Sequence, residues 1–161
     1  MNVQQVTALA MGAGEGWRVA ADLAVHKVPV VVKPLTDIPT FDALGATLEN
    51  PARLAKAGVT LVLSSFDTHN ARNLRQEAGN AISYGLDRDI ALRAVTLEPA
   101  RIWGVADRLG SLEAGKDADV VIWSGDPFEL TTGPERVFIA GSEMSKETRQ
   151  RQLFEKYSVL R

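Results

Sequence analysis

Three apolar segments mark the first part of the chain, and their spacing constrains the fold more than any other feature. The segments span residues 3–11, 28–32 and 59–64. The middle one, Val28-Pro29-Val30-Val31-Val32, is apolar throughout, which is typical of a parallel strand covered on both faces. The third segment has the same character. The sequence therefore predicts three buried parallel strands.

Helical patterns lie between these segments. The first covers residues 15–25, where four apolar side chains recur at helical spacing: Trp17, Ala20, Ala21 and Ala24. The second is a short helix over 51–57, which Asn50 is expected to cap and Gly58 to end. Between them, the long loop 33–49 is irregular and typical of loops that serve a site in α/β proteins.

More helices are predicted after the third apolar segment. One spans about 73–84 and ends at Gly85, and another begins at Asp87 and carries an apolar face over 90–95. Pro99 interrupts this pattern, and a further helical turn is expected over 100–103. The predicted order is therefore βαβαβα followed by helices.

The spacing of the strands indicates an α/β fold with a partial TIM barrel. Strand starts lie about 25 to 31 residues apart, which is natural for the βα units of such a barrel. Three units are too few to close eight strands, and an open sheet leaves two edges that proteins normally pair or cover. The chain is nevertheless long enough, at 161 residues, for one domain with a real core.

The pattern changes in the last third of the chain. Short strands are expected over 120–123 and 136–139, with glycine and proline between them. We predict three regions: residues 1–108 as a partial (β/α) barrel, 109–145 as β-strands of a second layer, and 146–161 as a charged tail. A weak helical face in this tail is formed by Leu153, Phe154 and Tyr157.

Composition excludes several classes of protein. The absence of cysteine rules out a disulfide scaffold, a thiolate zinc site and a cysteine nucleophile. A net charge of −2 predicts no nucleic-acid partner, and no apolar run approaches the roughly 20 residues of a membrane span. The start, Met1-Asn2-Val3-Gln4-Gln5, does not resemble a signal peptide. We therefore expect a cytoplasmic protein that does not act at a membrane.

Several motifs resemble one enzyme family. The stretch from Gly110 to Trp123 (GSLEAGKDADVVIW) resembles the G-S-L-E-x-G-K-x-A-D signature of the amidohydrolase superfamily. Residues 94–105 are similar to its T-x-x-P-A-x-x-x-G segment, and 70–79 are similar to its imidazolonepropionase-like and dipeptidase-like branch. The resemblance runs from about Gly14 to Gly141. It implies barrel strands six, seven and eight, followed by β-strands of the family's C-terminal sandwich.

The resemblance also implies a chemistry. These enzymes hydrolyse C–N bonds of cyclic amides, imides or peptide-like small molecules with a divalent metal such as zinc, which lowers the pKa of a bound water. Their ligands include a His-x-His on the first strand, a lysine or Glu, further histidines and an Asp at strand eight. This chain has only two histidines and no His-x-His. We therefore predict that it holds no metal and has no hydrolase activity by itself.

Asp67 is the candidate for the strand-eight carboxylate, as both catalytic residue and metal ligand. Counting from Gly58, Phe66 is the alternative occupant of that position, and a shift of one residue turns a strand side chain to the opposite face. A third interpretation is that Asp67 caps the helix that begins near Asn73.

Other polar residues near the predicted strand ends complete the candidate site. His69, Asn70 and Arg72 are predicted to bind substrate, since they follow the third strand at the catalytic end of a barrel. His26 precedes a strand and is expected at the surface. Gly12-Ala13-Gly14 could hold an anion through backbone N–H groups, although a plain turn is the simpler interpretation.

Three functions remain open at this point. The leading hypothesis is the C-terminal part of a metal-dependent amidohydrolase with a small-molecule substrate. The second is a non-catalytic remnant that folds by homo-oligomerisation, exchanging elements to cover its open edges. The third, a flavodoxin-like binding domain, is disfavoured by the signature at 110–123.

Overall fold

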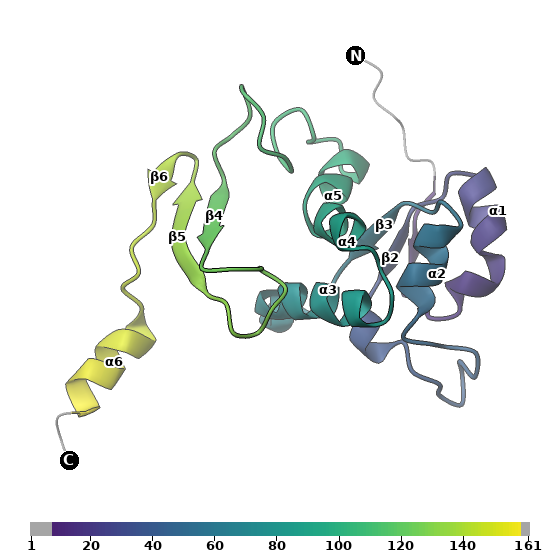
Figure 1. Cartoon of the computed structure of the whole chain (residues 1–161), viewed down its shortest axis with the longest axis horizontal. Helices are drawn as coiled ribbons and strands as arrows, with labels where there is room; N and C mark the ends of the chain where they lie inside the picture. The colour runs from purple at the N-terminus through teal and green to yellow at the C-terminus, as the bar shows by residue number, and fades with distance from the viewer. Residues whose placement is uncertain (1–7, 159–161) are drawn as a thin grey trace.

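The computed structural model describes residues 8–158 as two sheets with helices gathered around the first (Figure 1). The elements in chain order are β1 (Ala10–Met11), the 3-10 helix η1 (Gly16–Val19), α1 (Ala20–Val25), β2 (Val30–Val32), η2 (Pro34–Thr36), α2 (Asn50–Lys56), β3 (Leu61–Leu63), η3 (Thr68–Asn73), α3 (Leu74–Ser83), α4 (Arg88–Val95), α5 (Leu97–Ile102), β4 (Val120–Trp123), β5 (Pro134–Ile139), β6 (Ser142–Glu143) and α6 (Arg149–Ser158).

The three predicted strands form one parallel sheet in the order β1-β2-β3. Val30, Val31 and Val32 pair with Leu61, Val62 and Leu63, and Ala10 and Met11 pair with Val30 and Val31. Every residue of β2 and β3 is buried, so the prediction of buried parallel strands is confirmed for these two. It is wrong for β1, where Ala10 is half-buried and Met11 is 63% exposed. The strands are shorter than predicted, and residues 3–7 of the first apolar segment lie outside the described residues.

One hydrophobic core lies between this sheet and its helices. Leu54 of α2, Ala78 of α3 and Ala91 of α4 are fully buried in it, together with side chains of β2 and β3. Small alanines on α3 and α4 allow these helices to approach the sheet closely. The predicted helices over 15–25, 51–57, 73–84 and 87–95 are therefore confirmed to within a residue or two, the first of them beginning as the 3-10 helix η1.

Most helices begin and end where capping residues, glycine or proline in the local sequence predict it. Asp87 accepts hydrogen bonds from the N–H groups of Asp89 and Ile90 at the start of α4. Gly58 adopts a φ of 88° just after α2, as a C-terminal glycine should. Pro99 lies inside the first turn of α5, where its missing N–H costs no helical hydrogen bond. The helical turn predicted over 100–103 is therefore a helix that begins earlier, at Leu97.

Asn50 does not cap α2, so that prediction is wrong. Glu49 occupies the cap position, and Asn50 is the first helical residue with a fully buried side chain. Its Nδ2 donates to the Ala13 carbonyl at 2.8 Å and to Asp37 Oδ2 at 2.9 Å, and its Oδ1 accepts from the Trp17 N–H at 2.9 Å. This single amide joins the segment after β1, the loop after β2 and helix α2.

The second sheet is antiparallel, with the order β4-β5-β6. The predicted pair is confirmed, and β6 is an additional strand that the sequence did not suggest. No residue of this sheet is fully buried. It is joined to α3 through Arg75, which stacks over Trp123 at 5.3 Å and donates to the Thr132 carbonyl at 2.9 Å.

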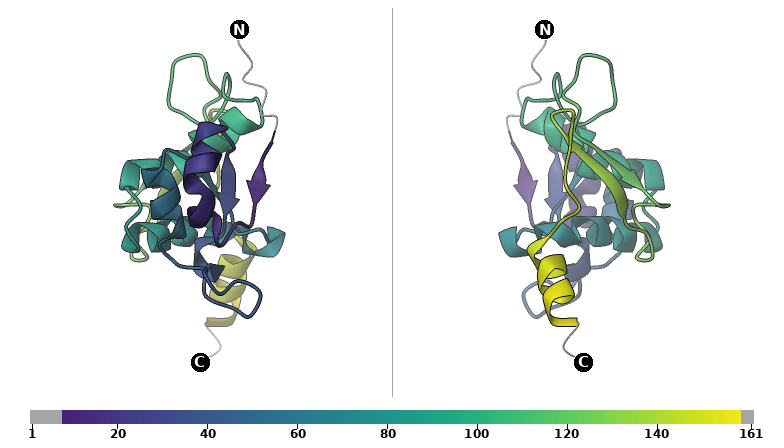
Figure 2. Two further views of the ribbon diagram at one scale, coloured as in Figure 1. Left: turned by 90° about the vertical axis from the view of Figure 1, so that its right-hand side faces the viewer. Right: turned by 90° about the vertical axis from the view of Figure 1, so that its left-hand side faces the viewer.

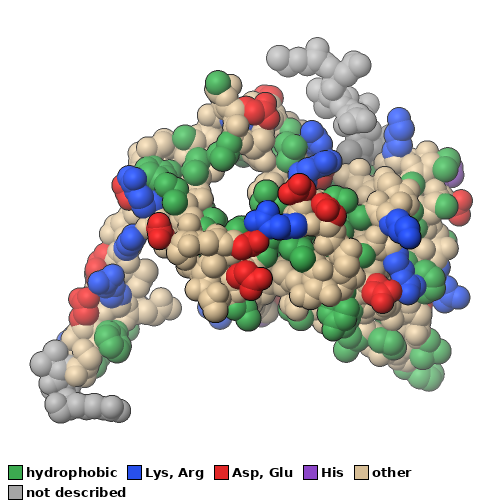
Figure 3. All heavy atoms as spheres, in the orientation of Figure 1, with side chains coloured by type: hydrophobic (Ala, Val, Ile, Leu, Met, Phe, Trp, Pro, Cys, Tyr) green, Lys and Arg blue, Asp and Glu red, His purple; other side chains and the backbone are tan. Residues whose placement is uncertain are grey.

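Helix α6 confirms the helical pattern of the tail, and it lies apart from both sheets (Figure 2). Its apolar residues Leu153, Phe154 and Tyr157 are exposed. Acidic and basic side chains are interspersed over the face seen in Figure 3, without a large patch of one sign. None of the helices within residues 8–158 combines the length and apolarity needed to cross a bilayer.

Replacing Asn50 tests the importance of its buried amide. We expect Asn50→Ala to lower the free energy of unfolding by about 3 kcal/mol, because several buried partners lose their hydrogen bonds at once. Urea unfolding followed by circular dichroism measures this. The matched control is Asn73→Ala, which removes an amide that makes no capping hydrogen bond. Equal, small losses in both variants would contradict the assignment.

Candidate functional site

Parallel strands bring their carboxyl ends to one edge, and a pocket opens there. It has a volume of about 170 Å³ and is lined by the turn after β1, the loop 33–46 and Phe66. We call it the carboxyl-end pocket. Its charged lining side chains are Lys33, which follows β2, and Asp37. Ile38 and Phe66 add apolar surface.

Asp67 lies beside this pocket and is paired with Lys33. Lys33 Nζ donates to Asp67 Oδ2 at 3.0 Å, which joins the chain just after β2 to the chain after β3. The hydrogen bond from Lys33 and its positive charge lower the pKa of Asp67. The carboxylate therefore stays ionised with an ammonium as its counter-ion. Asp67 is the cap residue of η3 but makes no side-chain capping bond, so the capping interpretation is wrong.

Of the two residues considered after β3, Phe66 is the one that faces the pocket. Its φ is 53°, a left-handed conformation that is rare for a bulky residue and costs on the order of 1–3 kcal/mol. Its side chain is 42% exposed and lines the pocket. The turn after β3 thus directs Phe66 into the pocket and Asp67 toward Lys33. The assignment of Asp67 as catalytic residue and metal ligand stays a prediction.

The predicted substrate-binding residues lie on η3. His69 and Arg72 are exposed, and Asn70 is half-buried. The amide of Asn70 lies 3.1 Å from His69 Nε2. None of these three residues lines the carboxyl-end pocket as residues 8–158 form it, so their role also stays a prediction. His26 is exposed and interacts with the Asp22 carbonyl at 2.8 Å, which confirms its expected place at the surface.

Two buried carboxyl groups near Lys33 escaped the sequence analysis. Asp37 is 7% exposed and Glu77, on α3, is 2% exposed. Asp37 accepts from Asn50, and Glu77 Oε2 accepts from the Leu35 N–H at 2.9 Å. Burial raises the pKa of both groups. The burial of Glu77 could have been predicted from its place on the helix face that also carries Ala78 and Ala81.

The glycines after β1 serve the turn. Gly12 has a φ of 67°, and a Cβ on Gly14 would lie 3.2 Å from Asp37 Oδ1. The N–H groups of Gly12 and Gly14 already donate to the carbonyls of Val31 and Gly12. They are not free to hold an anion, and the simpler interpretation as a turn is the better one.

A metal ion does not fit the described residues alone. No group of three His, Asp or Glu side chains able to hold one occurs in residues 8–158, and the Asp67 carboxylate is already paired with Lys33. Among the described residues, the carboxyl-end pocket therefore offers the Lys33 ammonium and the buried Asp37 carboxyl group, with Asp67 beside it, but no ligand shell.

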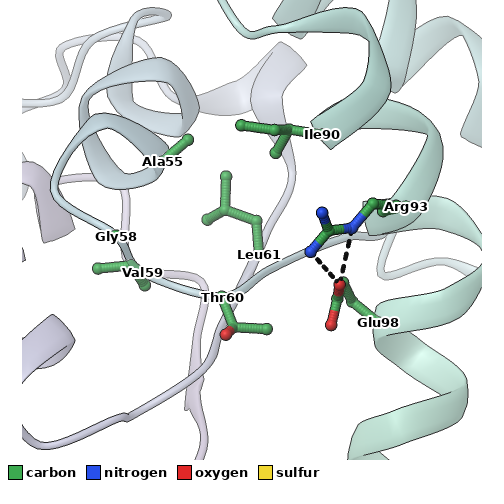
Figure 4. Close-up of a pocket in the computed structure, with 8 residues that line it drawn as sticks. All are labelled: Ala55, Gly58, Val59, Thr60, Leu61, Ile90, Arg93 and Glu98. Atoms are coloured by element: carbon green, nitrogen blue, oxygen red, sulfur yellow. Dashed lines mark hydrogen bonds and ion pairs between the residues drawn. The ribbon is translucent and has the colours of Figure 1, made fainter.

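A second pocket, of about 200 Å³, lies at the opposite end of β3 (Figure 4). Glu98 is 7% exposed there, and its Oε1 accepts from Arg93 at 2.8 Å and Arg101 at 2.9 Å. These bonds connect α4 to α5. Because Glu98 is held by two arginines and lies at the amino end of the strand, its role is to join the two helices.

Glu77 makes stability depend on pH. Its pKa is higher in the folded chain, so its contribution to stability is full below the unfolded-state pKa and is lost as pH rises through the folded-state pKa. Glu77→Gln keeps an acceptor for Leu35 without the charge. We expect the variant to match the parent near about pH 4 and to exceed it in stability near about pH 7. Urea titrations at both values measure this, with the exposed Glu147→Gln as control. A constant difference between variant and parent would contradict the assignment.

Sequence relatives match parts of the chain. An amidohydrolase, tasK, from Hapsidospora irregularis is 41% identical over 73 residues, which are 45% of this chain and 7% of that protein. An imidazolonepropionase from Mesorhizobium japonicum is 51% identical over 51 residues, 31% of this chain and 12% of that one. The chain thus spans a small part of the curated relatives that it matches.

Solved structures and a family model extend the match over most of the chain. An amidohydrolase from Thermotoga maritima superposes with a TM-score of 0.77 at 37% identity, over 86% of this chain and 37% of that one. An adenosine deaminase from Xanthomonas campestris with bound zinc has a TM-score of 0.62 at 22% identity, over 96% and 42%, and shows the fold alone. The model of the amidohydrolase family matches residues 15–145. This chain therefore belongs to the amidohydrolase family.

Proposed function

We propose that this chain forms the C-terminal part of a metal-dependent amidohydrolase that acts on C–N bonds of cyclic amide, imide or peptide-like substrates, and that it is inactive alone. The observation that carries the proposal is the juxtaposition of Lys33 and Asp67 at the carboxyl ends of β2 and β3. Sites in barrels of parallel strands lie at this edge. Residues 8–158 contribute one edge of the site but no complete set of metal ligands.

In this proposal β1, β2 and β3 are barrel strands six, seven and eight. The similarity to the Thermotoga maritima amidohydrolase, which covers 86% of this chain but 37% of that one, supports it. The exposed antiparallel sheet is part of the family's sandwich, which a further layer covers in the whole protein. Both open edges of the parallel sheet then pair with the remaining barrel strands.

Asp67 is the carboxylate that this part contributes. Its low pKa keeps it charged, and Lys33 supplies the positive charge that balances it in the separate chain. The remaining ligands for a zinc-like divalent ion come from the other barrel strands, since residues 8–158 do not supply them. His69, Asn70 and Arg72 follow Asp67 on η3, and we propose that they contact a substrate above the strand ends.

Self-association is the second candidate function. It is favoured by the exposed apolar residues of the antiparallel sheet and of α6, among them Ile139 at 53% and Phe154 at 72% exposure. An amphipathic helix without a partner gains stability by burying its apolar stripe. A second copy of the chain is the available partner when the rest of the barrel is absent.

Turnover tests the inactivity of the separate chain. With added zinc or manganese we expect no hydrolysis of imidazolonepropionate, hydantoin or dipeptides above the buffer blank, because the described residues hold too few ligands. A chimera carrying the front part of the Thermotoga maritima amidohydrolase is expected to take up zinc, measured by elemental analysis. Asp67→Asn should lower this uptake at least about tenfold, and Asp126→Asn should not. Hydrolysis by the pure chain would refute the proposal.

Light scattering after size exclusion tests self-association. We expect the chain to elute as a dimer or larger species, and Phe154→Ser to shift it toward the monomer by removing exposed apolar area. Phe41→Ser, at an exposed loop residue, is the control. A compact monomer at every concentration would contradict this second function.

A further inference from the structure

The pocket at the amino end of β3 has an apolar side and a charged side, and we call it the amino-end pocket. Its volume is about 200 Å³. In Figure 4, Ala55 and Ile90 lie on one side of it and Arg93 and Glu98 on the other, with Leu61 between them. The proposed amidohydrolase site does not use this pocket, because that site lies at the other end of the strand.

The Glu98 carboxylate accepts its hydrogen bonds through one oxygen. Its Oε1 accepts from Arg93 Nε at 3.1 Å, from Arg93 Nη2 at 2.8 Å and from Arg101 Nη1 at 2.9 Å, and no group within residues 8–158 donates to Oε2. The side chain is only 9% exposed, and a carboxylate oxygen removed from water without a donor costs free energy. Figure 4 shows Oε2 turned away from Arg93, toward the side of Thr60, which also lines the pocket.

Arg93 has donors that Glu98 does not use. A guanidinium carries five N–H groups, and two of them go to Glu98 Oε1. Figure 4 shows the remaining nitrogen on the side away from Glu98, toward Ile90. Arg93 and Glu98 are joined at 2.8 Å, so one small molecule reaches the unused donors and the unused acceptor together.

The charges around Glu98 leave room for an anionic group and a cationic group on one ligand. Two guanidinium groups face one carboxylate, which leaves an excess positive charge. Glu113 interacts with the charge of Arg101, but it is already paired with Lys116 at 3.3 Å. A ligand carboxylate therefore balances the excess charge and accepts charge-assisted hydrogen bonds.

A ligand with one charge satisfies only part of this cluster. A carboxylate alone leaves Glu98 Oε2 without a donor, and an amine alone meets two guanidinium groups of its own sign. A zwitterion supplies a partner to both Arg93 and Glu98. An α-amino acid holds its two charges on one carbon atom, which suits protein groups that share a single ion pair.

The opposite side of the pocket suits a hydrocarbon group. Leu61 is 2% exposed and Val59 is 6% exposed, and Ala55 and Ile90 are half-buried beside them. Burying an aliphatic side chain against this surface is favourable. The volume lies below the range that is typical for drug-sized ligands, so the pocket accommodates a small molecule.

We propose that the amino-end pocket binds an α-amino acid with an aliphatic side chain. The ligand carboxylate accepts hydrogen bonds from Arg93, its ammonium donates to Glu98 Oε2, and its side chain packs against Ala55, Leu61 and Ile90. This binding site goes beyond the proposed function, because it lies at the amino end of β3 and takes no part in hydrolysis.

The experiment uses L-leucine as the probe and the full chain as the receptor. Amide chemical shifts in ¹⁵N-labelled protein follow the binding, which we expect in the millimolar range with shifts at Gly58, Ile90 and Arg93. Two analogues each lack one charge: 4-methylpentanoate has no ammonium, and 3-methylbutylamine has no carboxylate. Both are expected to bind at least about tenfold more weakly, the loss of a hydrogen bond to a charged group. Glycine, which lacks the hydrocarbon group, is also expected to bind more weakly.

Two variants locate the contacts. Ala55→Leu fills the apolar side without touching the ion pair, and Arg93→Met removes the donor. Both should weaken binding of L-leucine at least about tenfold. The matched controls are Ala21→Leu at an exposed helical position and Arg151→Met, which breaks an exposed ion pair with Glu155. Neither control should change binding, and melting curves verify that each variant folds.

Equal binding of L-leucine and 4-methylpentanoate would overturn the inference, as would shifts that appear only at the carboxyl ends of the strands or no shifts at all. The comparison of ligands needs no variant, so it decides the matter even if a variant fails to fold. Zinc uptake by the chimera concerns the other end of the strands. Its outcome therefore tests the proposed function separately.

Discussion

The parallel pairing of β2 with β1 and β3 is the constraint on which the rest of the structure depends. Val30, Val31 and Val32 are buried and pair with β3, and the first two also pair with β1, so this strand cannot slip without exposing apolar side chains. The register carries the ends of all three strands to one edge. Lys33 and Asp67, 34 positions apart in sequence, meet there at 3.0 Å.

The buried amide of Asn50 holds the connections around the sheet in place. It bonds to Ala13 and Trp17 in the connection between β1 and β2, and to Asp37 in the connection between β2 and β3. Much of the long loop after β2 is exposed, and it is held by this amide together with the hydrogen bond from the Leu35 N–H to Glu77. This hub at Asn50 therefore shapes the pocket wall that contains Asp37.

Polar groups at the two ends of β3 have different roles. At its amino end, two arginines hold Glu98 where α4 meets α5. At its carboxyl end, the Asp67 carboxylate pairs with Lys33 beside the carboxyl-end pocket. The chain belongs to the amidohydrolase family over residues 15–145. Barrel enzymes have their active sites at the carboxyl ends of the strands, which agrees with this difference between the two ends of β3.

The sequence by itself determined the order of the main strands and helices, the parallel strands, most helix ends and the resemblance to the family. These features follow from local rules, such as the apolar run at Val30, the cap at Asp87 and the glycine at Gly58. Only the tertiary structure decided that Asn50 is a buried hub, that Asp37 and Glu77 are buried acids, and that Phe66 faces the pocket. Those outcomes depend on contacts between distant segments and on a left-handed φ, and neither leaves a periodic trace in the sequence.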